Sequence, residues 1–225
     1  MSGLEITVRG RAERQYRPEQ GTAILSAEFT ESTSEEAHAK ALELQSEVVA
    51  ELTRLDETNA LNAWHANDIH VFGHRPWIDG KESTEVVYTT RIAMTAEFLD
   101  FEALAAFLVE WAGRDGLTVS RIVWDVLDEN RPRYEAKVRR DAVRDAVAKA
   151  QAYADAVGRG SVTAVALADP SMLGSGGDGG GPVAPAGAMY ARAMAAPPDS
   201  GPTLELRPDD VVIAVSVDAR FTVGE

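Results

Sequence analysis

Apolar and polar residues alternate along several stretches of the chain, and this two-residue period predicts β-strands. Near the N-terminus the alternation covers residues 4–14 and 22–31. The stretches 83–98 and 211–223 alternate over their whole length. Each of these strands therefore has one face suited to a core and one suited to solvent.

Helices are predicted where apolar residues recur every three or four positions. Ser32 and Thr33 each precede a glutamate by three residues, as in a capping box, so a helix is expected to begin there. Its apolar stripe consists of Ala37, Ala41, Leu44, Val48, Leu52 and Leu55. A second helix follows Asp100. The third and longest covers about 131–157, with a predicted apolar stripe of Ala136, Val143, Val147, Ala150, Ala154 and Val157.

A long hairpin is predicted in the middle of the chain. Residues 62–74 form its first strand, Asp79-Gly80 its turn, and residues 83–98 its return strand. Sixteen residues at about 3.3 Å each extend over roughly 50 Å, which exceeds an ordinary strand. We therefore expect the return strand to bend or to pass from one lobe into another.

These elements predict an α+β fold, a two-lobed α/β sandwich of mainly antiparallel sheets with three main helices. An apolar strand at 162–168 completes the order β-β-α-β-β-α-β-α-β-β. The expected lobes are residues 1–82 for the first, and 83–169 with 204–225 for the second. The intervening residues 170–203 are rich in glycine and proline and are expected to form a flexible loop.

Composition narrows the classes of function. The formal net charge of −14 disfavours binding to nucleic acid and to anionic membranes. The chain has no cysteine, which excludes disulfides, thiolate metal sites and a cysteine nucleophile. No apolar stretch has the length of a membrane span or the pattern of a signal peptide, so the expected location is cytoplasmic.

Candidate chemical sites are few. His65, His70 and His74 lie in a segment predicted to be extended, where positions four apart are about 13 Å apart and cannot share an ion without a second strand. The glycine run at 174–181 lacks the Lys-Ser/Thr of a phosphate loop and is interpreted as a linker. We find no Gly-x-Ser-x-Gly, His-Glu-x-x-His or acid pair. The chain is therefore predicted not to be an enzyme and to need no cofactor or metal.

Two surfaces remain as candidates for binding. Arg133, Lys137, Arg140 and Arg144 fall on one helical face and suit an anionic partner. The alternative is a solvated helix face that pairs with the protein's own acidic surface. Apolar residues predicted to be exposed suit a homo-oligomer interface. They lie at the hairpin tip and in the 170–203 loop, and are Phe72, Trp77, Ile78, Met189, Tyr190 and Met194.

The pattern also resembles a known family. Val8-Arg9-Gly10-Arg11-Ala12, the helix segment Ala142–Ala150, the loop segment Met189–Met194 and Ile213–Val217 are together similar to SIMPL-domain proteins, which include bacterial periplasmic immunogenic antigens and stress-related proteins. The resemblance extends over the whole chain, so we expect a single SIMPL-like domain. It implies a two-lobed α/β fold and, in some members, ring-like or channel-like homo-oligomers. It supplies no catalytic residues.

Two functions follow from this sequence. The first is a non-enzymatic oligomeric scaffold or partner-binding protein linked to stress tolerance. The second is a small-molecule or anion-binding protein, or an unrecognised enzyme, that uses the basic face at 133–144 and the 170–203 loop. Convergent polar groups in a pocket would favour the second, and an exposed apolar patch would favour the first.

Overall fold

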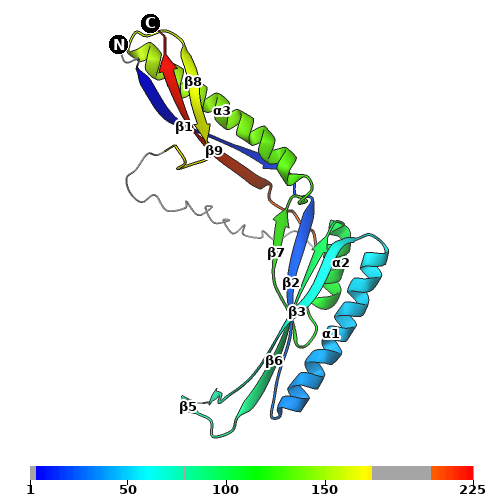
Figure 1. Cartoon of the computed structure of the whole chain (residues 1–225). Helices are drawn as coiled ribbons and strands as arrows, with labels where there is room; N and C mark the ends of the chain where they lie inside the picture. The colour runs from blue at the N-terminus through cyan, green and yellow to red at the C-terminus, as the bar shows by residue number, and fades with distance from the viewer. Residues whose placement is uncertain (1–3, 79, 174–203, 225) are drawn as a thin grey trace, which may run out of the picture. The chain divides into compact units, whose positions relative to one another are not determined.

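The computed structural model describes residues 4–78, 80–173 and 204–224, apart from the side chains of Asn67 and Ile78 (Figure 1). It confirms the α+β class and the predicted order of elements, with two short strands added at the hairpin tip. The elements are β1 (Glu5–Tyr16), β2 (Gln20–Glu31), α1 (Ser34–Glu57), β3 (Leu61–His74), β4 (Trp77–Ile78), β5 (Lys81–Glu82), β6 (Val87–Phe98), α2 (Phe101–Trp111), β7 (Leu117–Asp125), α3 (Arg131–Ala156), β8 (Val162–Ala168) and β9 (Val211–Val223).

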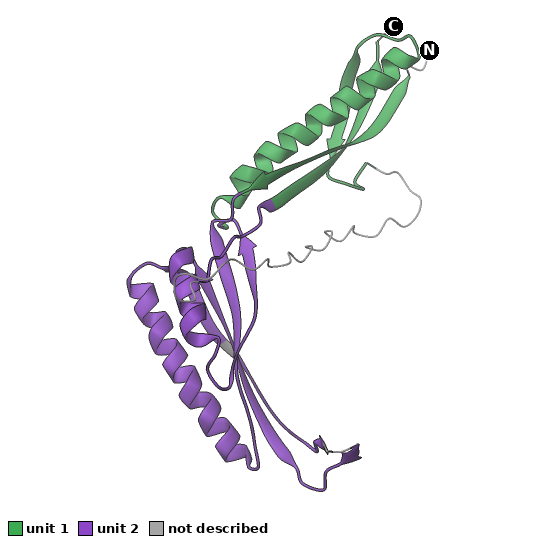
Figure 2. Cartoon of the chain, turned by 180° about the vertical axis from the view of Figure 1, so that it is seen from behind, with its two compact units in different colours: residues 1–16, 128–198, 212–225 green, residues 17–127, 199–211 purple. Residues whose placement is uncertain are grey.

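The chain forms two compact units, coloured separately in Figure 2. Unit 1 contains residues 1–16, 128–198 and 212–225, and unit 2 contains residues 17–127 and 199–211. These bounds differ from the predicted lobes, which divided the chain within the hairpin. The difference has a simple cause, because β1 belongs to a sheet with β9 and β8, whereas β3 and β6 pair along their length within unit 2.

Unit 2 is a four-stranded sheet, ordered β3-β6-β2-β7, with α1 and α2 packed on one face. The strands are antiparallel neighbours, and the residues that share the helix-covered face come from alternate positions. Leu25 on β2 is paired with Met94 on β6, and both are buried against the helices. Phe98 at the end of β6 contacts Phe107 of α2, which joins this helix to the same core.

Helix α1 begins as the sequence predicts. The backbone N–H of Glu36 donates to Oγ1 of Thr33 over 3.3 Å, which satisfies one of the amides that the first turn leaves unpaired. Every residue of the predicted apolar stripe is buried, from Ala37 to Leu55. The helix is therefore held mainly by its packing on the sheet.

The hairpin return is shorter than predicted. The sequence predicted one strand over 83–98, but regular pairing with β3 begins at Val87. Residues 83–86 belong to no strand and separate β6 from the two-residue strand β5. The register of β3 against β6 shifts between Leu61 and Ala63 and again between Ala66 and Asp68. Such bulges bend a strand, so the long hairpin is an interrupted rather than a straight ladder.

Unit 1 is a three-stranded sheet, ordered β1-β9-β8, with α3 on one face. The predicted bounds of the last two strands, 162–168 and 211–223, are those of β8 and β9. The core contains Ile6 and Val8 from β1, Phe221 from β9, and a row of alanines from α3.

The predicted stripe of α3 is correct only at Ala150 and Ala154. Ala136, Val147 and Val157 are exposed and Val143 is only half-buried. The buried residues are Val138, Ala142, Ala146, Ala150 and Ala154. The reason is close packing on β1. A Cβ atom at Gly10 would lie 2.0 Å from the carbonyl oxygen of Ala142, so the helix backbone approaches the strand at a distance that only small residues allow.

Among the described residues, no helix is long and apolar enough to cross a membrane. Within the predicted loop 170–203, residues 174–203 lie outside the part of the chain that the structure describes.

Candidate interaction surfaces

The tip of the β3–β6 hairpin exposes large apolar side chains. We call residues 69–90 the distal hairpin. Ile69 and Val71 are each 49% exposed and lie opposite Ile92 and Thr90, which are buried. This contrast arises because β3 is the outermost strand of the sheet. Figures 1 and 2 show the end of the hairpin diverging from α1, so the helix does not cover it.

The opposite face of the distal hairpin carries Phe72 and Val87 among polar side chains. Phe72 is 50% exposed, and its ring contacts the ring of His74 with centroids 5.7 Å apart. His65, His70 and His74 all pair with odd-numbered residues of β6, which places them on this same face of β3. His70 lies 3.0 Å from a carboxylate oxygen of Asp68.

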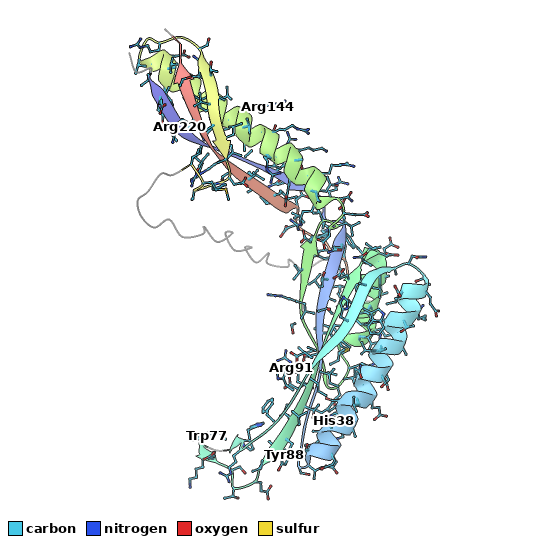
Figure 3. All side chains as sticks on the ribbon, viewed as in Figure 1. His38, Trp77, Tyr88, Arg91, Arg144 and Arg220 are labelled. Atoms are coloured by element: carbon cyan, nitrogen blue, oxygen red, sulfur yellow. The ribbon has the colours of Figure 1, made fainter. Side chains whose placement is uncertain are left out.

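Trp77 is the most exposed aromatic residue of the distal hairpin, at 73%, and lies at its end (Figure 3). Of the six predicted interface residues, Phe72 and Trp77 are thus exposed as expected. Ile78 lies in β4, and the structure does not describe its side chain. Met189, Tyr190 and Met194 also lie outside the described residues. Sequence reasoning missed Ile69 and Val71, although their alternation on a strand was a signal for them.

The four predicted anion-facing residues of α3 divide into two groups. Arg133 and Lys137 both lie over the ring of Tyr134, with their charged groups 5.6 Å and 5.7 Å from its centroid. Tyr134 in turn stacks on Tyr16 of β1, with centroids 4.1 Å apart. These two cations are therefore held at the start of the helix by an aromatic pair.

Arg140 and Arg144 lie farther along and line a shallow hollow together with Arg139, which the sequence analysis did not select. The floor of the hollow is apolar, formed by Ala136 and Val143. Arg144, labelled in Figure 3, donates to Asp141 over 3.2 Å. Arg139 and Arg140 are exposed and form no ion pair with any other described residue. The hollow therefore combines an apolar floor with two uncompensated guanidinium groups.

Asp141 and Asp145 connect α3 to β1. Asp141 accepts from Arg14 over 2.7 Å, and Asp145 accepts the backbone N–H of Arg11 over 2.8 Å. The hydrogen bond from Arg14 holds the pKa of Asp141 below its ordinary value. The hydrogen bonds from Lys149 and from the backbone amide of Arg11 likewise lower the pKa of Asp145. The basic helix is thus partly neutralised on its strand-facing side.

A further polar cluster lies on the sheet of unit 1. Asp218 on β9 is 8% exposed and accepts two hydrogen bonds from Arg9, the shorter over 2.6 Å. It also accepts the backbone N–H of Ser171 over 2.7 Å, and Arg220 donates to the carbonyl of Leu173 over 3.4 Å. The cluster therefore fastens residues 171–173, which follow β8, onto β9.

No group of three or more His, Asp or Glu residues within the described ranges is arranged to hold a metal ion. The chain contains no cysteine. What the described residues offer is an apolar hairpin tip, a basic hollow and a polar cluster.

A known protein family is similar to the chain. A search of curated proteins found none that is similar. The family model of SIMPL, described as a protein of unknown function (DUF541), matches residues 6–221. The match begins in β1 and ends in β9, and so includes both units. The chain therefore belongs to the SIMPL family.

Proposed function

We propose that this protein is a non-enzymatic scaffold that assembles with copies of itself through the distal hairpin. The observation that supports this proposal is the exposure of Trp77 at the tip, together with Ile69, Val71 and Phe72 on the two faces of β3. Ile69 and Val71 are neighbours on one face of β3, and large contiguous apolar patches are uncommon on proteins that stay monomeric. Burying them contributes about 25 cal/mol for each Å² removed from water.

Charge opposes this association. Each copy carries −14, so protomers repel one another at low ionic strength. Salt screens this repulsion, with a Debye length of about 10 Å at 0.1 M. Assembly should therefore strengthen as salt is added, which is the reverse of what an interface of ion pairs would show. A link to stress tolerance and a cytoplasmic location stay predictions of the sequence alone.

We expect Trp77→Asp to convert an assembled protein to the 24.2 kDa monomer. A carboxylate placed in an apolar contact would have to be desolvated, which costs more than the contact contributes. Light scattering over a range of protein and salt concentrations measures this. Tyr153→Asp is the matched control, because Tyr153 on α3 is an aromatic residue of similar exposure, 61% against 73%. A wild-type monomer at tens of micromolar in both low and moderate salt would refute the proposal.

The basic hollow supports a second candidate function, binding of a small anion. Arg139 and Arg140 stand without carboxylate partners among the described residues, beside the apolar floor of Ala136 and Val143. This arrangement suits a phosphorylated or carboxylated small molecule with an apolar part.

We expect inorganic pyrophosphate to bind at low ionic strength. The double variant Arg139→Gln with Arg140→Gln should weaken this binding about tenfold or more, because it loses two guanidinium groups. Isothermal titration calorimetry measures the affinity. Arg75→Gln with Arg159→Gln removes the same charge elsewhere, at two exposed positions. If that control weakens binding equally, only the overall charge matters and the hollow is not a site.

A further inference from the structure

Unit 2 has an apolar groove that neither function above uses. One wall is the C-terminal half of α2 with the residue after it, and the other is the edge strand β7. Leu108 and Val109 stand on the helix side, and Val119 and Ile122 on the strand side. Leu204 completes the lining, in the segment that leads to β9. The groove has a volume of about 740 Å³, within the range of about 300–1,000 Å³ that is typical of small-molecule sites.

A β-bulge shapes the strand side of the groove. Val119 pairs with Leu25 and Ile122 pairs with Ala23, so both face the helices although they lie three residues apart. This is possible because the register of β7 against β2 shifts between these pairs. Without the shift, strand alternation would turn one of these side chains to the other face.

The lining is only partly filled by the protein's own side chains. Leu108 is buried and forms the base, whereas Val109 is 54% exposed and Leu204 is 44% exposed. Two large apolar side chains of the lining therefore remain in contact with water. An apolar chain bound in the groove would remove both from water.

Arg121 is the one charged residue of the lining. It pairs with Ile24, between Ala23 and Leu25, so its side chain leaves the other face of β7 and borders the groove from the outer edge of this edge strand. It is exposed and forms no ion pair with another described residue. Glu205, which stands between Leu204 and Leu206 in the sequence, accepts from Arg207 over 3.0 Å.

From the apolar walls and the single unpaired guanidinium group, we propose that this groove binds an aliphatic carboxylate, with the alkyl chain along α2 and β7 and the carboxylate at Arg121. A monoanion matches the one cation of the lining. A dianion or a purely apolar molecule would leave one charge uncompensated.

Displacement of a fluorescent fatty acid, cis-parinaric acid, from the full chain tests this assignment. Octanoate, decanoate and dodecanoate serve as competitors below their micellar concentrations. Affinity should rise about twofold to threefold for each CH₂ added, somewhat less than for full burial, because the groove is open on one side. Decanoate should compete better than decan-1-ol.

Variants then locate the site. Val109→Glu should abolish displacement by decanoate, because it places a carboxylate beside the alkyl chain. Val147→Glu is the matched control, since Val147 is an exposed valine on α3 of unit 1 and should leave the affinity unchanged. Arg121→Gln should weaken decanoate about threefold to tenfold and leave decan-1-ol unaffected.

Three results would overturn the proposal. The first is no binding of the probe, and the second is an equal effect of Val109→Glu and Val147→Glu. The third is that Val109→Glu changes the mass of the protein in solution without changing probe binding, which would assign the groove to a second copy of the chain.

Discussion

Replacing Gly10 with alanine is expected to lower the free energy of unfolding of unit 1 by about 3 kcal/mol or more, the upper part of the range for overpacked cores. The added Cβ would lie 2.0 Å from the carbonyl oxygen of Ala142 and 2.8 Å from the Cβ of Ala146. Both contacts are with atoms fixed to the helix backbone, so no side chain can turn aside. Strand β1 and α3 would have to separate.

The placement of the tryptophans makes this effect measurable for each unit. All four, Trp64, Trp77, Trp111 and Trp124, belong to unit 2. Urea unfolding followed by tryptophan fluorescence should therefore be nearly unchanged in Gly10→Ala, whereas hydrogen exchange of peptides from β1 and α3 should accelerate.

Gly113→Ala is the matched control. Nothing lies within 4 Å of a Cβ at this position, and its φ is not positive, so we expect a change within about 0.5 kcal/mol. Equal exchange of α3 in wild type and Gly10→Ala would show that the strand and the helix are not in close contact.

This contact also explains why α3 was harder to predict than α1. In α1 the buried positions hold the larger apolar residues, such as Leu44 and Leu52, and the periodic stripe identifies them. In α3 the buried face is almost entirely alanine, while Val143 and Val147 lie outside it. A hydrophobicity pattern weights valine above alanine, but close packing on Gly10 requires the smaller residue.

The division into units depends on pairings that local patterns do not contain. The strand bounds 162–168 and 211–223 were predictable because alternation is a property of the strand itself. The pairing of β1 with β9, at the other end of the chain, was not predictable from such a local pattern. Arg9 and Asp218 lie 209 positions apart in the sequence, and only the sheet brings them together.

The candidate surfaces were predictable to a similar degree. Exposure of Phe72 and Trp77 follows from apolar residues placed near a hairpin turn. The hollow at Arg139 and the groove at Arg121 could not be predicted from the sequence, because each depends on which side of a helix or strand faces its neighbour. In the groove, a single bulge determines that orientation.

Replacing Asp218 with asparagine is expected to lower the stability of unit 1 by about 1.5–3 kcal/mol at neutral pH, the range for hydrogen bonds to charged groups. Asp218 is 8% exposed and accepts from Arg9 and from the amide of Ser171. Asparagine keeps an acceptor for that amide but loses the negative charge opposite the guanidinium group. Hydrogen exchange in β9 and in residues 162–173 reports the change.

The effect should depend on pH in a defined direction. Hydrogen bonding from Arg9 holds the pKa of Asp218 below its ordinary value, and the Ser171 amide adds to this although partial burial opposes it. The ionised carboxylate therefore stabilises the folded state fully above its unfolded pKa of about 3.9, and this stabilisation is lost as the pH falls through the lower, folded value. The difference between wild type and Asp218→Asn should thus be constant near neutral pH and shrink in acid.

Some acid sensitivity should remain in the Asp218→Asn variant, since the pKa values of Asp141 and Asp145 are lowered in the same unit and act in the same direction. Glu13→Gln removes one negative charge from an exposed position on β1 and should leave the stability of unit 1 almost unchanged at every pH. A difference between wild type and Asp218→Asn that persists undiminished well below pH 4 would mean that the lost contribution is steric. The ion pair would then not be what fastens residues 171–173 to β9.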